Sequence, residues 1–173
     1  MSKMKIEVIK ASITNSDTDA IVNAANEYLY RGSGVCGAIF EAAGDGLEEE
    51  CQKIGHCNTG EAVITGAYNL KNKYIIHAVG PIYPCPDAKK LLYGAYYNSL
   101  LLADKNKCDD ISFPSISTGV YNYPILEASY IAFDAIYDFI NDYKDTTLKN
   151  IRFYVLDDDN FYALNDLIKK KYR

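Results

Sequence analysis

The 173-residue sequence contains no long apolar run and no long run of basic residues. A membrane-spanning helix requires about 18 or more consecutive apolar residues, and no stretch approaches that length. The N-terminal residues are not followed by the apolar core of a signal peptide. We therefore expect a cytoplasmic protein that does not contact a membrane.

Charge and cysteine content argue against further classes of protein. With a formal net charge of −5, the chain is poorly suited to sequence-independent nucleic-acid binding, which depends on many Lys and Arg contacts to phosphates. Its five cysteines are odd in number and lack paired CxxC spacing, which argues against a disulfide framework or a structural zinc site. We expect free thiols, no cofactor, no nucleic-acid partner and a monomer. Any bound phosphate would be held mainly by backbone N–H groups.

Strand-like and helix-like stretches alternate along the whole chain, without a linker, repeat or low-complexity segment. This alternation is typical of one α/β domain, here residues 1–173. Short stretches rich in Val, Ile and Tyr predict strands at residues 6–9, 20–24, 61–65, 74–79, 110–114 and 151–156. Helices are predicted at 35–54 with a break at 44–46, at 89–105, from Pro124 onward, and at 161–171.

The helix after Tyr123 has the clearest pattern. Pro124 suits the first helical position, and apolar residues recur at Leu126, Tyr130, Phe133, Tyr137 and Ile140. We expect this stripe to pack on the sheet.

Two loops each connect a predicted strand to the following helix, and ligands bind at such connections in open α/β sheets. The first contains Asn-Ala-Ala-Asn at 23–26 and Gly-Ser-Gly-Val at 32–35. Glycines allow close backbone approach, and the start of the next helix offers unpaired N–H groups to an anion. An ordinary Gly-x-Gly connection is the alternative, since neither the Walker spacing nor Gly-x-Gly-x-x-Gly is present.

The second loop is Ser-Ile-Ser-Thr-Gly-Val-Tyr at 115–121, between a strand and the helix at Pro124. Its N–H and O–H groups could bind a phosphate, and its aromatic ring could cover a sugar. A tight turn with a core tyrosine is the alternative interpretation.

Taken together, these loops resemble the macrodomain signature. The resemblance covers Asp-Ala-Ile-Val-Asn-Ala-Ala-Asn at 19–26, Gly-Ser-Gly-Val at 32–35 and Ala-Ala-Gly at 42–44. It continues with Thr-Gly-Glu-Ala at 59–62, Ile-His-Ala-Val-Gly-Pro at 76–81 and residues 113–121. A series in this order across nearly the whole chain is highly specific. It implies a three-layer α/β/α sandwich around a mixed, roughly six-stranded sheet, with ADP-ribose in a cleft at the strand ends.

The resemblance also implies roles for individual residues. Asn26 and Tyr121 would contact the distal ribose, residues 32–35 and 117–120 would hold the phosphates from two sides, and Ile13 and Leu156 would line an adenine slot. The implied ADP-ribose contacts are Ser12, Ile13, Asn23, Asn26, Gly32, Ser33, Gly34, Val35, Cys36, Ser117, Thr118, Gly119, Val120, Tyr121, Leu156 and Asp157, with Asn26 and Tyr121 as the catalytic residues.

The sequence departs from the family pattern at two positions. Many members have an acidic residue where this chain has Ser12, whose hydroxyl can accept a bond from the adenine amino group without charge assistance; Asp157 is a possible substitute. The MacroD-like hydrolase branch has an aspartate at the position of Cys36. Some viral hydrolases of the family read Gly-Val-Cys there, as this chain does. No activating base is apparent beside this thiol, which favours a small helix residue over a reactive group.

Three other groups could suggest chemistry, and each has a structural alternative that we favour. His77, inside a predicted strand, is expected to be a hydrogen-bonded structural residue. His56 with Cys51 and Cys57 are metal-ligand types at a spacing that fits no standard zinc site. The acidic run at 157–159 could bind magnesium, but an acidic first turn of the next helix explains it through the helix dipole.

Two classes of function fit the sequence. One is a mono-ADP-ribosyl hydrolase acting on esters of acidic side chains or related O-linked derivatives, with an ADP-ribose 1″-phosphate phosphatase as a variant. The other is a non-catalytic ADP-ribose reader. Because neither loop offers an obvious general acid, the leaving group must depart unaided, as a carboxylate does. We therefore predict metal-free hydrolysis by a water that the substrate's own phosphate orients, with Asn26 fixing the distal ribose.

Overall fold

The fold of the computed structural model is a six-stranded mixed sheet between two layers of helices, as predicted. The structure describes residues 4–171, so the ends of the predicted single domain, residues 1–3 and 172–173, lie outside the described part. The strands are β1 (Lys5–Lys10), β2 (Ala20–Ala24), β3 (Ala62–Gly66), β4 (Tyr74–Ala78), β5 (Asp110–Phe113) and β6 (Asn150–Val155). Their order is β1-β6-β5-β2-β4-β3, so β1 and β3 form the two edges. All neighbours are parallel except β3, which is antiparallel to β4.

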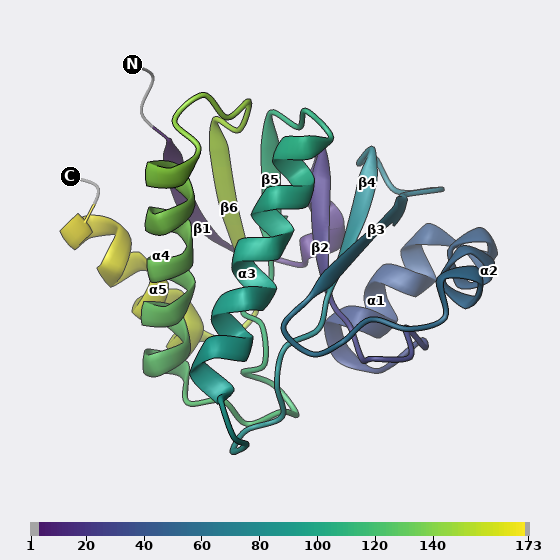
Figure 1. Cartoon of the computed structure of the whole chain (residues 1–173), viewed down its shortest axis with the longest axis horizontal. Coiled ribbons are helices and arrows are strands. Elements are labelled where there is room, and N and C mark those ends of the chain that lie inside the picture. The colour runs from purple at the N-terminus through teal and green to yellow at the C-terminus, as the bar shows by residue number, and fades with distance from the viewer. Residues whose placement is uncertain (1–3, 172–173) are drawn as a thin grey trace.

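Five α-helices and one short 3-10 helix accompany the described strands. They are η1 (Ile13–Asn15), α1 (Gly34–Ala43), α2 (Asp45–Ile54), α3 (Ala88–Lys105), α4 (Ile125–Asp142) and α5 (Asp158–Lys171). In Figure 1, α3 and α4 lie side by side on the face of the sheet nearest the viewer. The predicted break at 44–46 is a single residue, Gly44, with φ +89° between α1 and α2.

Two apolar cores lie on opposite faces of the sheet because the strand residues alternate. Val22 and Ile76 pack with α3, α4 and α5, whereas Ile21 and Ile75 pack with α1 and α2. Within residues 4–171, no helix has both the length and the apolar character needed to cross a membrane.

Two predictions for α4 were wrong. Pro124 precedes the helix as its N-cap, with ψ 127°, and is not the first helical residue. The predicted stripe is wrong in part: Leu126 and Tyr130 are exposed, whereas Phe133 is fully buried and Ile140 packs against the core. The buried apolar residues of α4 are Ala128, Ile131, Ala132, Phe133, Ala135, Ile136 and Phe139. Large side chains, among them Phe133, Ile136 and Phe139, lie fully buried beside the alanines.

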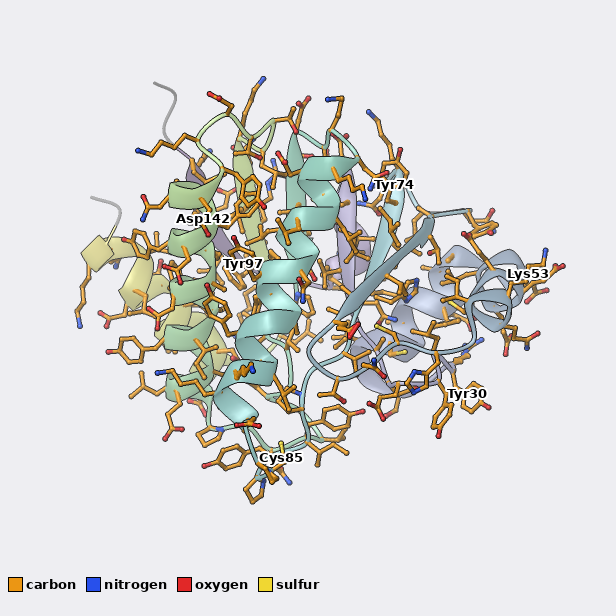
Figure 2. The ribbon with its side chains drawn as sticks, in the orientation of Figure 1. Tyr30, Lys53, Tyr74, Cys85, Tyr97 and Asp142 are labelled. Atoms are coloured by element: carbon orange, nitrogen blue, oxygen red, sulfur yellow. The ribbon has the colours of Figure 1, made fainter. Side chains whose placement is uncertain are left out.

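The outer surfaces of α3 and α4 are joined by tyrosine–aspartate hydrogen bonds. Tyr97 Oη donates to Asp142 Oδ2 at 2.5 Å, and Tyr93, one turn earlier, donates to Asp138 at 2.6 Å. Figure 2 shows Tyr97 and Asp142 together on this face. The helix after β6 begins three residues earlier than predicted, at Asp158, because Asp157 caps its first turn.

Candidate functional site

A cleft of about 730 Å³ opens at the carboxyl ends of the parallel strands. Ala24 ends β2, Val155 ends β6, and Ala11 and Pro114 follow β1 and β5; all four residues line the cleft. Cavities of this size hold small-molecule ligands in many proteins. The fold therefore brings the two glycine-containing loops to the two sides of one cleft.

Every predicted contact residue except Asn23 lines this cleft. Sequence reasoning did not predict nine further lining residues as contacts: Ala11, Ala24, Ala38, Pro114, Ser115, Ile125, Tyr154, Val155 and Asn160. Two of them could have been noticed from the sequence. Ser115 opens the second loop, and Asn160 stands three residues after Asp157, the spacing between a helix N-cap and the residue whose N–H it accepts.

The first loop is held by the side chain of Asn26. Its Nδ2 donates to Tyr30 O at 2.8 Å, and its Oδ1 accepts from Tyr30 N at 3.0 Å. The amide therefore closes a small ring of hydrogen bonds within the loop, and one Nδ2 hydrogen stays available to the cleft. The Tyr30 side chain points outward beyond α1 (Figure 2).

Glycines let the first loop and α1 come into close contact. A Cβ on Gly37 would lie 2.7 Å from the carbonyl oxygen of Gly32, so a side chain there would push the loop away from the helix. Gly34 has φ +59°, which L-residues rarely adopt, and the space beside it is open. The N–H groups of the first turn of α1 have no acceptor within the helix and face an anion favourably.

The second loop is built differently. Ser117 has φ +67° and lies directly over Gly80, where a Cβ would stand 2.2 Å from Ser117 Oγ. Ser117 Oγ is buried without a hydrogen-bond partner in the described part of the chain. Among residues 4–171, no acceptor is found for the backbone N–H groups of Ser117, Gly119, Val120 and Tyr121. The loop thus presents several unpaired donors beside the cleft.

Other elements anchor this second loop. Tyr96 Oη on α3 accepts from Ile116 N at 2.9 Å, and Tyr83 N donates to Tyr121 O at 2.8 Å. Tyr123 N, just before α4, donates to Ser117 O at 2.9 Å. The shape of the loop therefore depends on residues distant in the sequence.

Asn23, predicted as a ligand contact, lies beneath the cleft instead and is fully buried. Its Nδ2 is 3.1 Å from His77 Nδ1 and 3.6 Å from Cys36 Sγ. His77 Nε2 is 2.9 Å from Thr65 Oγ1, which donates to Gly66 O. This confirms His77 as a hydrogen-bonded structural residue. Burial lowers its pKa to about 4, so the ring is neutral at pH 7.

Cys36 occupies the first turn of α1 and is buried. Its thiol approaches Tyr30 O at 3.7 Å and Asn23 Nδ2 at 3.6 Å, both neutral groups. Within residues 4–171, neither of these contacts places a base against the sulfur. The surroundings agree with a small packing residue, as the sequence indicated.

The adenine end predicted from the sequence lies between η1 and the end of β6. Ile13 is buried, whereas Leu156 is 69% exposed. The hydroxyl of Ser12 already caps η1, at 3.4 Å from Thr14 N and 2.8 Å from Thr14 Oγ1. Asp157 borders the cleft and accepts from Asn160 N at 2.9 Å. Asp158 and Asp159 form the acidic first turn of α5, which confirms the helix-dipole interpretation of this run.

His56, Cys51 and Cys57, which are metal-ligand types, contact different neighbours. The ring of His56 packs edge-on against Tyr28, Cys51 Sγ lies 3.9 Å from His77, and Cys57 Sγ donates to Asn58 O. All five cysteines, each within the described residues, are free thiols. No group of three metal-ligand side chains was found in residues 4–171.

The side chains that line the described cleft offer few titratable groups, namely Cys36, Tyr121, Tyr154 and Asp157. Partial burial, with Cys36 and Glu27 nearby, raises the pKa of Tyr121, which is therefore protonated at pH 7. Asp157 follows β6 and is bonded to Asn160, which in turn contacts Ser115 and Thr118 of the second loop. The geometry therefore provides anion-binding N–H groups and a phenol, without a carboxylic acid between the two loops.

Comparison with known proteins agrees with this architecture. The family model of the Macro domain matches residues 22–132. An O-acetyl-ADP-ribose deacetylase of Escherichia fergusonii is 43% identical over 98% of both chains. The Oceanobacillus iheyensis macrodomain solved with ADP has a TM-score of 0.87 and 38% identity, over 94% of this chain and 88% of that one. The Trypanosoma brucei macrodomain solved with ADP-ribose has a TM-score of 0.88 and 36% identity, over 94% and 68%.

Proposed function

Because this chain belongs to the macrodomain family, we propose that it binds ADP-ribose in the cleft and hydrolyses ADP-ribose esters. The observation that carries the proposal is the pair of loops with unpaired backbone N–H groups on the two sides of one cleft. None of the described residues that line this cleft is a lysine or an arginine. Such a site suits a pyrophosphate bound through backbone N–H groups and a helix N-terminus.

The relatives support both halves of the proposal. Macrodomains of similar structure bind ADP and ADP-ribose, and a relative that matches nearly the full length is an O-acetyl-ADP-ribose deacetylase. We assign the diphosphate to the first turn of α1 and to residues 117–120. Adenine then lies between Ile13 and Leu156, and the distal ribose lies near Asn26 and Tyr121.

The composition of the cleft supports cleavage of a bond whose leaving group needs no proton. A water attacks the anomeric carbon of the distal ribose, the bond from this carbon to the ester oxygen breaks, and the electron pair leaves with the carboxylate. The carboxylate, whose conjugate acid has a pKa of about 4, needs no proton to depart. The water's proton passes to the substrate phosphate or to solvent. A serine alkoxide would require a general acid, which the residues between the loops do not supply.

The same chemistry extends to small molecules. An acetyl group on the anomeric oxygen forms the same kind of bond as an ADP-ribosylated glutamate, so one mechanism serves both substrates. The deacetylase relative favours this small-molecule substrate as a second candidate.

The test is release of free ADP-ribose from glutamate-linked and serine-linked ADP-ribosylated peptides. We expect turnover of the glutamate ester alone. Asn26→Ala should lower turnover by about 10²-fold, comparable to losing one preorganised donor in other enzymes. Since Asn26 also holds Tyr30, the affinity for ADP-ribose is measured in parallel. A loss of turnover larger than the loss of affinity indicates positioning, whereas equal losses indicate a collapsed loop.

Cys36→Ala, in the first turn of the helix that follows this loop, provides the control. It should change turnover by less than about threefold, because a thiol without an activating partner is a weak base and a poor proton donor. An inactive Cys36→Ala protein that still binds ADP-ribose would contradict this mechanism, as would efficient cleavage of the serine ether. Binding without turnover of any ester would leave a non-catalytic reader.

A further inference from the structure

A buried amide connects the two ends of the cleft. Asn160, in the first turn of α5, is only 6% exposed and lines the cleft between Asp157 and the second loop. Polar side chains this deeply buried need hydrogen-bond partners, and the partners of Asn160 come from two different segments.

On one side, Asn160 holds the carboxylate of Asp157. Its backbone N–H donates to Asp157 Oδ2 at 2.9 Å, and its Nδ2 donates to Asp157 Oδ1 at 3.0 Å. Partial burial opposes ionisation of Asp157, but these hydrogen bonds outweigh it and lower the pKa of the carboxyl group. The carboxylate is therefore charged at pH 7 and has a fixed orientation.

On the other side, the same amide holds the second loop. Its Oδ1 accepts from Ser115 Oγ at 2.7 Å, and its Nδ2 lies 3.3 Å from Thr118 Oγ1. Thr118 Oγ1 in turn donates to Ser115 O at 3.0 Å, which leaves its lone pairs free to accept from Asn160. An ionised carboxylate can only accept, so Asp157 fixes which end of the amide faces Ser115.

We propose that Asn160 is a positioning residue that couples the adenine end of the cleft to the phosphate-binding loop, so that removing the Asp157 carboxylate loosens a loop that it does not contact. This coupling rests on the proposed function for its role in ADP-ribose binding. The hydrogen-bond chain itself can be tested without any ligand.

The first test is amide hydrogen exchange of the free protein. The probes are the N–H groups of Asn122 and Tyr123, which donate to Gly119 O and Ser117 O of the loop. We expect Asp157→Ala and Asn160→Ala each to speed exchange several-fold, and the double variant to exchange no faster than Asn160→Ala alone. Asp159→Ala, which removes the same charge from an exposed position in the same turn, should leave both rates unchanged.

Additive effects in the double variant would overturn the coupling, as would unchanged rates in Asp157→Ala. If Asn160→Ala fails to fold, Ser115→Ala removes the shorter of the two contacts between Asn160 and the loop and leaves the contacts with Asp157 in place. In that background, Asp157→Ala should have a clearly smaller effect on the two exchange rates than in the native protein.

The second test uses ADP-ribose and Asn160→Asp. This variant keeps an acceptor for Ser115 but loses both amide donors and sets a second carboxylate against Asp157. Two carboxylates at this distance resist joint ionisation, so the pair should take up a proton as the pH falls. We expect the affinity of Asn160→Asp for ADP-ribose to rise about tenfold from pH 7 to pH 5. Tenfold corresponds to a difference of about one unit between the pKa of the carboxyl pair in the free and in the bound protein. The affinity of the native protein should not rise.

A purely structural role of Asn160 would lower affinity at every pH and would not create this dependence. A flat profile for Asn160→Asp would overturn the coupling. If the native protein does not bind ADP-ribose at all, the proposed function fails, and the exchange rates still decide whether Asn160 links the two segments.

Discussion

The two loops that face each other across the cleft differ in how their shape is maintained. In the first, the side chain of Asn26 bonds the backbone of Tyr30 four positions later, and Glu27 accepts hydrogen bonds from Cys57 and Thr59. The second is held by Tyr96 from α3, by Asn160 from α5 and by Tyr83 from the connection before α3. The hydrogen bonds between Asn26 and Tyr30 depend on two neighbouring residues, whereas the shape of the second loop should respond to substitutions far from it in sequence.

The largest expected effect is a loss of ADP-ribose binding, of similar size for either loop. Gly34→Glu or Gly119→Glu places a carboxylate beside the proposed phosphates, and such like-charge contacts cost several kcal/mol, so ADP-ribose affinity should fall at least about 100-fold. No atom lies within 4 Å of an added Cβ at either glycine, so the fold should persist. Calorimetry and thermal melting measure the two quantities.

Alanine at the same two positions distinguishes the loops by the backbone conformation that each glycine adopts. Gly34→Ala carries a backbone cost of about 1 kcal/mol at φ +59°, whereas Gly119→Ala carries none of this kind. Unchanged affinity in both glutamate variants would place the ligand elsewhere.

The next effect is a dependence of the stability of the fold on pH, caused by His77 beneath the first loop. Burial lowers the pKa of His77 from 6.5 to about 4, so between these values the unfolded chain binds a proton that the folded chain does not. The stabilisation is complete above pH 6.5 and is lost as the pH falls toward 4, on the order of 3 kcal/mol. Urea unfolding at pH 7 and pH 4.5 measures the loss, and His77→Gln should reduce it. An equal loss in both proteins would assign the acid sensitivity to other groups.

The smallest effect tests whether the hydrogen bond from Tyr96 on α3 maintains the shape of the second loop. Tyr96→Phe removes the acceptor of Ile116 N, which lies at a buried position, and should destabilise the fold by about 1–3 kcal/mol. It should also weaken ADP-ribose binding, because Ile116 precedes the donors of the second loop. Tyr93→Phe, on the same helix, loses an exposed bond to Asp138 and should leave binding unchanged. Equal binding by both variants would show that the loop keeps its shape without Tyr96.

Much of the fold could be predicted from the sequence because its signals are local. Short stretches rich in Val, Ile and Tyr gave all six strands to within one residue at each end, and glycine marked the break between α1 and α2. The buried face of α4 could not be found in this way. Apolar residues cover several sides of this helix, and only the packed neighbours decide that Phe133 is buried while Leu126 and Tyr130 are exposed.

The same distinction applies to the site. The glycine-containing loops carry their own pattern, and the family resemblance supplied nearly all of the lining residues. It placed Asn23 in the cleft, although the residue faces His77 beneath it. Asn160 was missed because its partners Ser115 and Thr118 lie more than 40 positions away in sequence. Only the parallel pairing of β5 and β6 brings these residues together.

The edge strand β1 affects whether copies of the protein associate at high concentration. Its unpaired backbone edge could accept a strand from another copy and start an open-ended assembly. Lys5 and Lys10 stand at the two ends of β1. A symmetric antiparallel pairing of two β1 strands would set Lys5 opposite Lys10, and an in-register parallel pairing would set each lysine opposite its own copy. Both arrangements bring like charges directly across, which is unfavourable. The charges at the ends of β1 therefore oppose fibre-like stacking of the molecule through this edge.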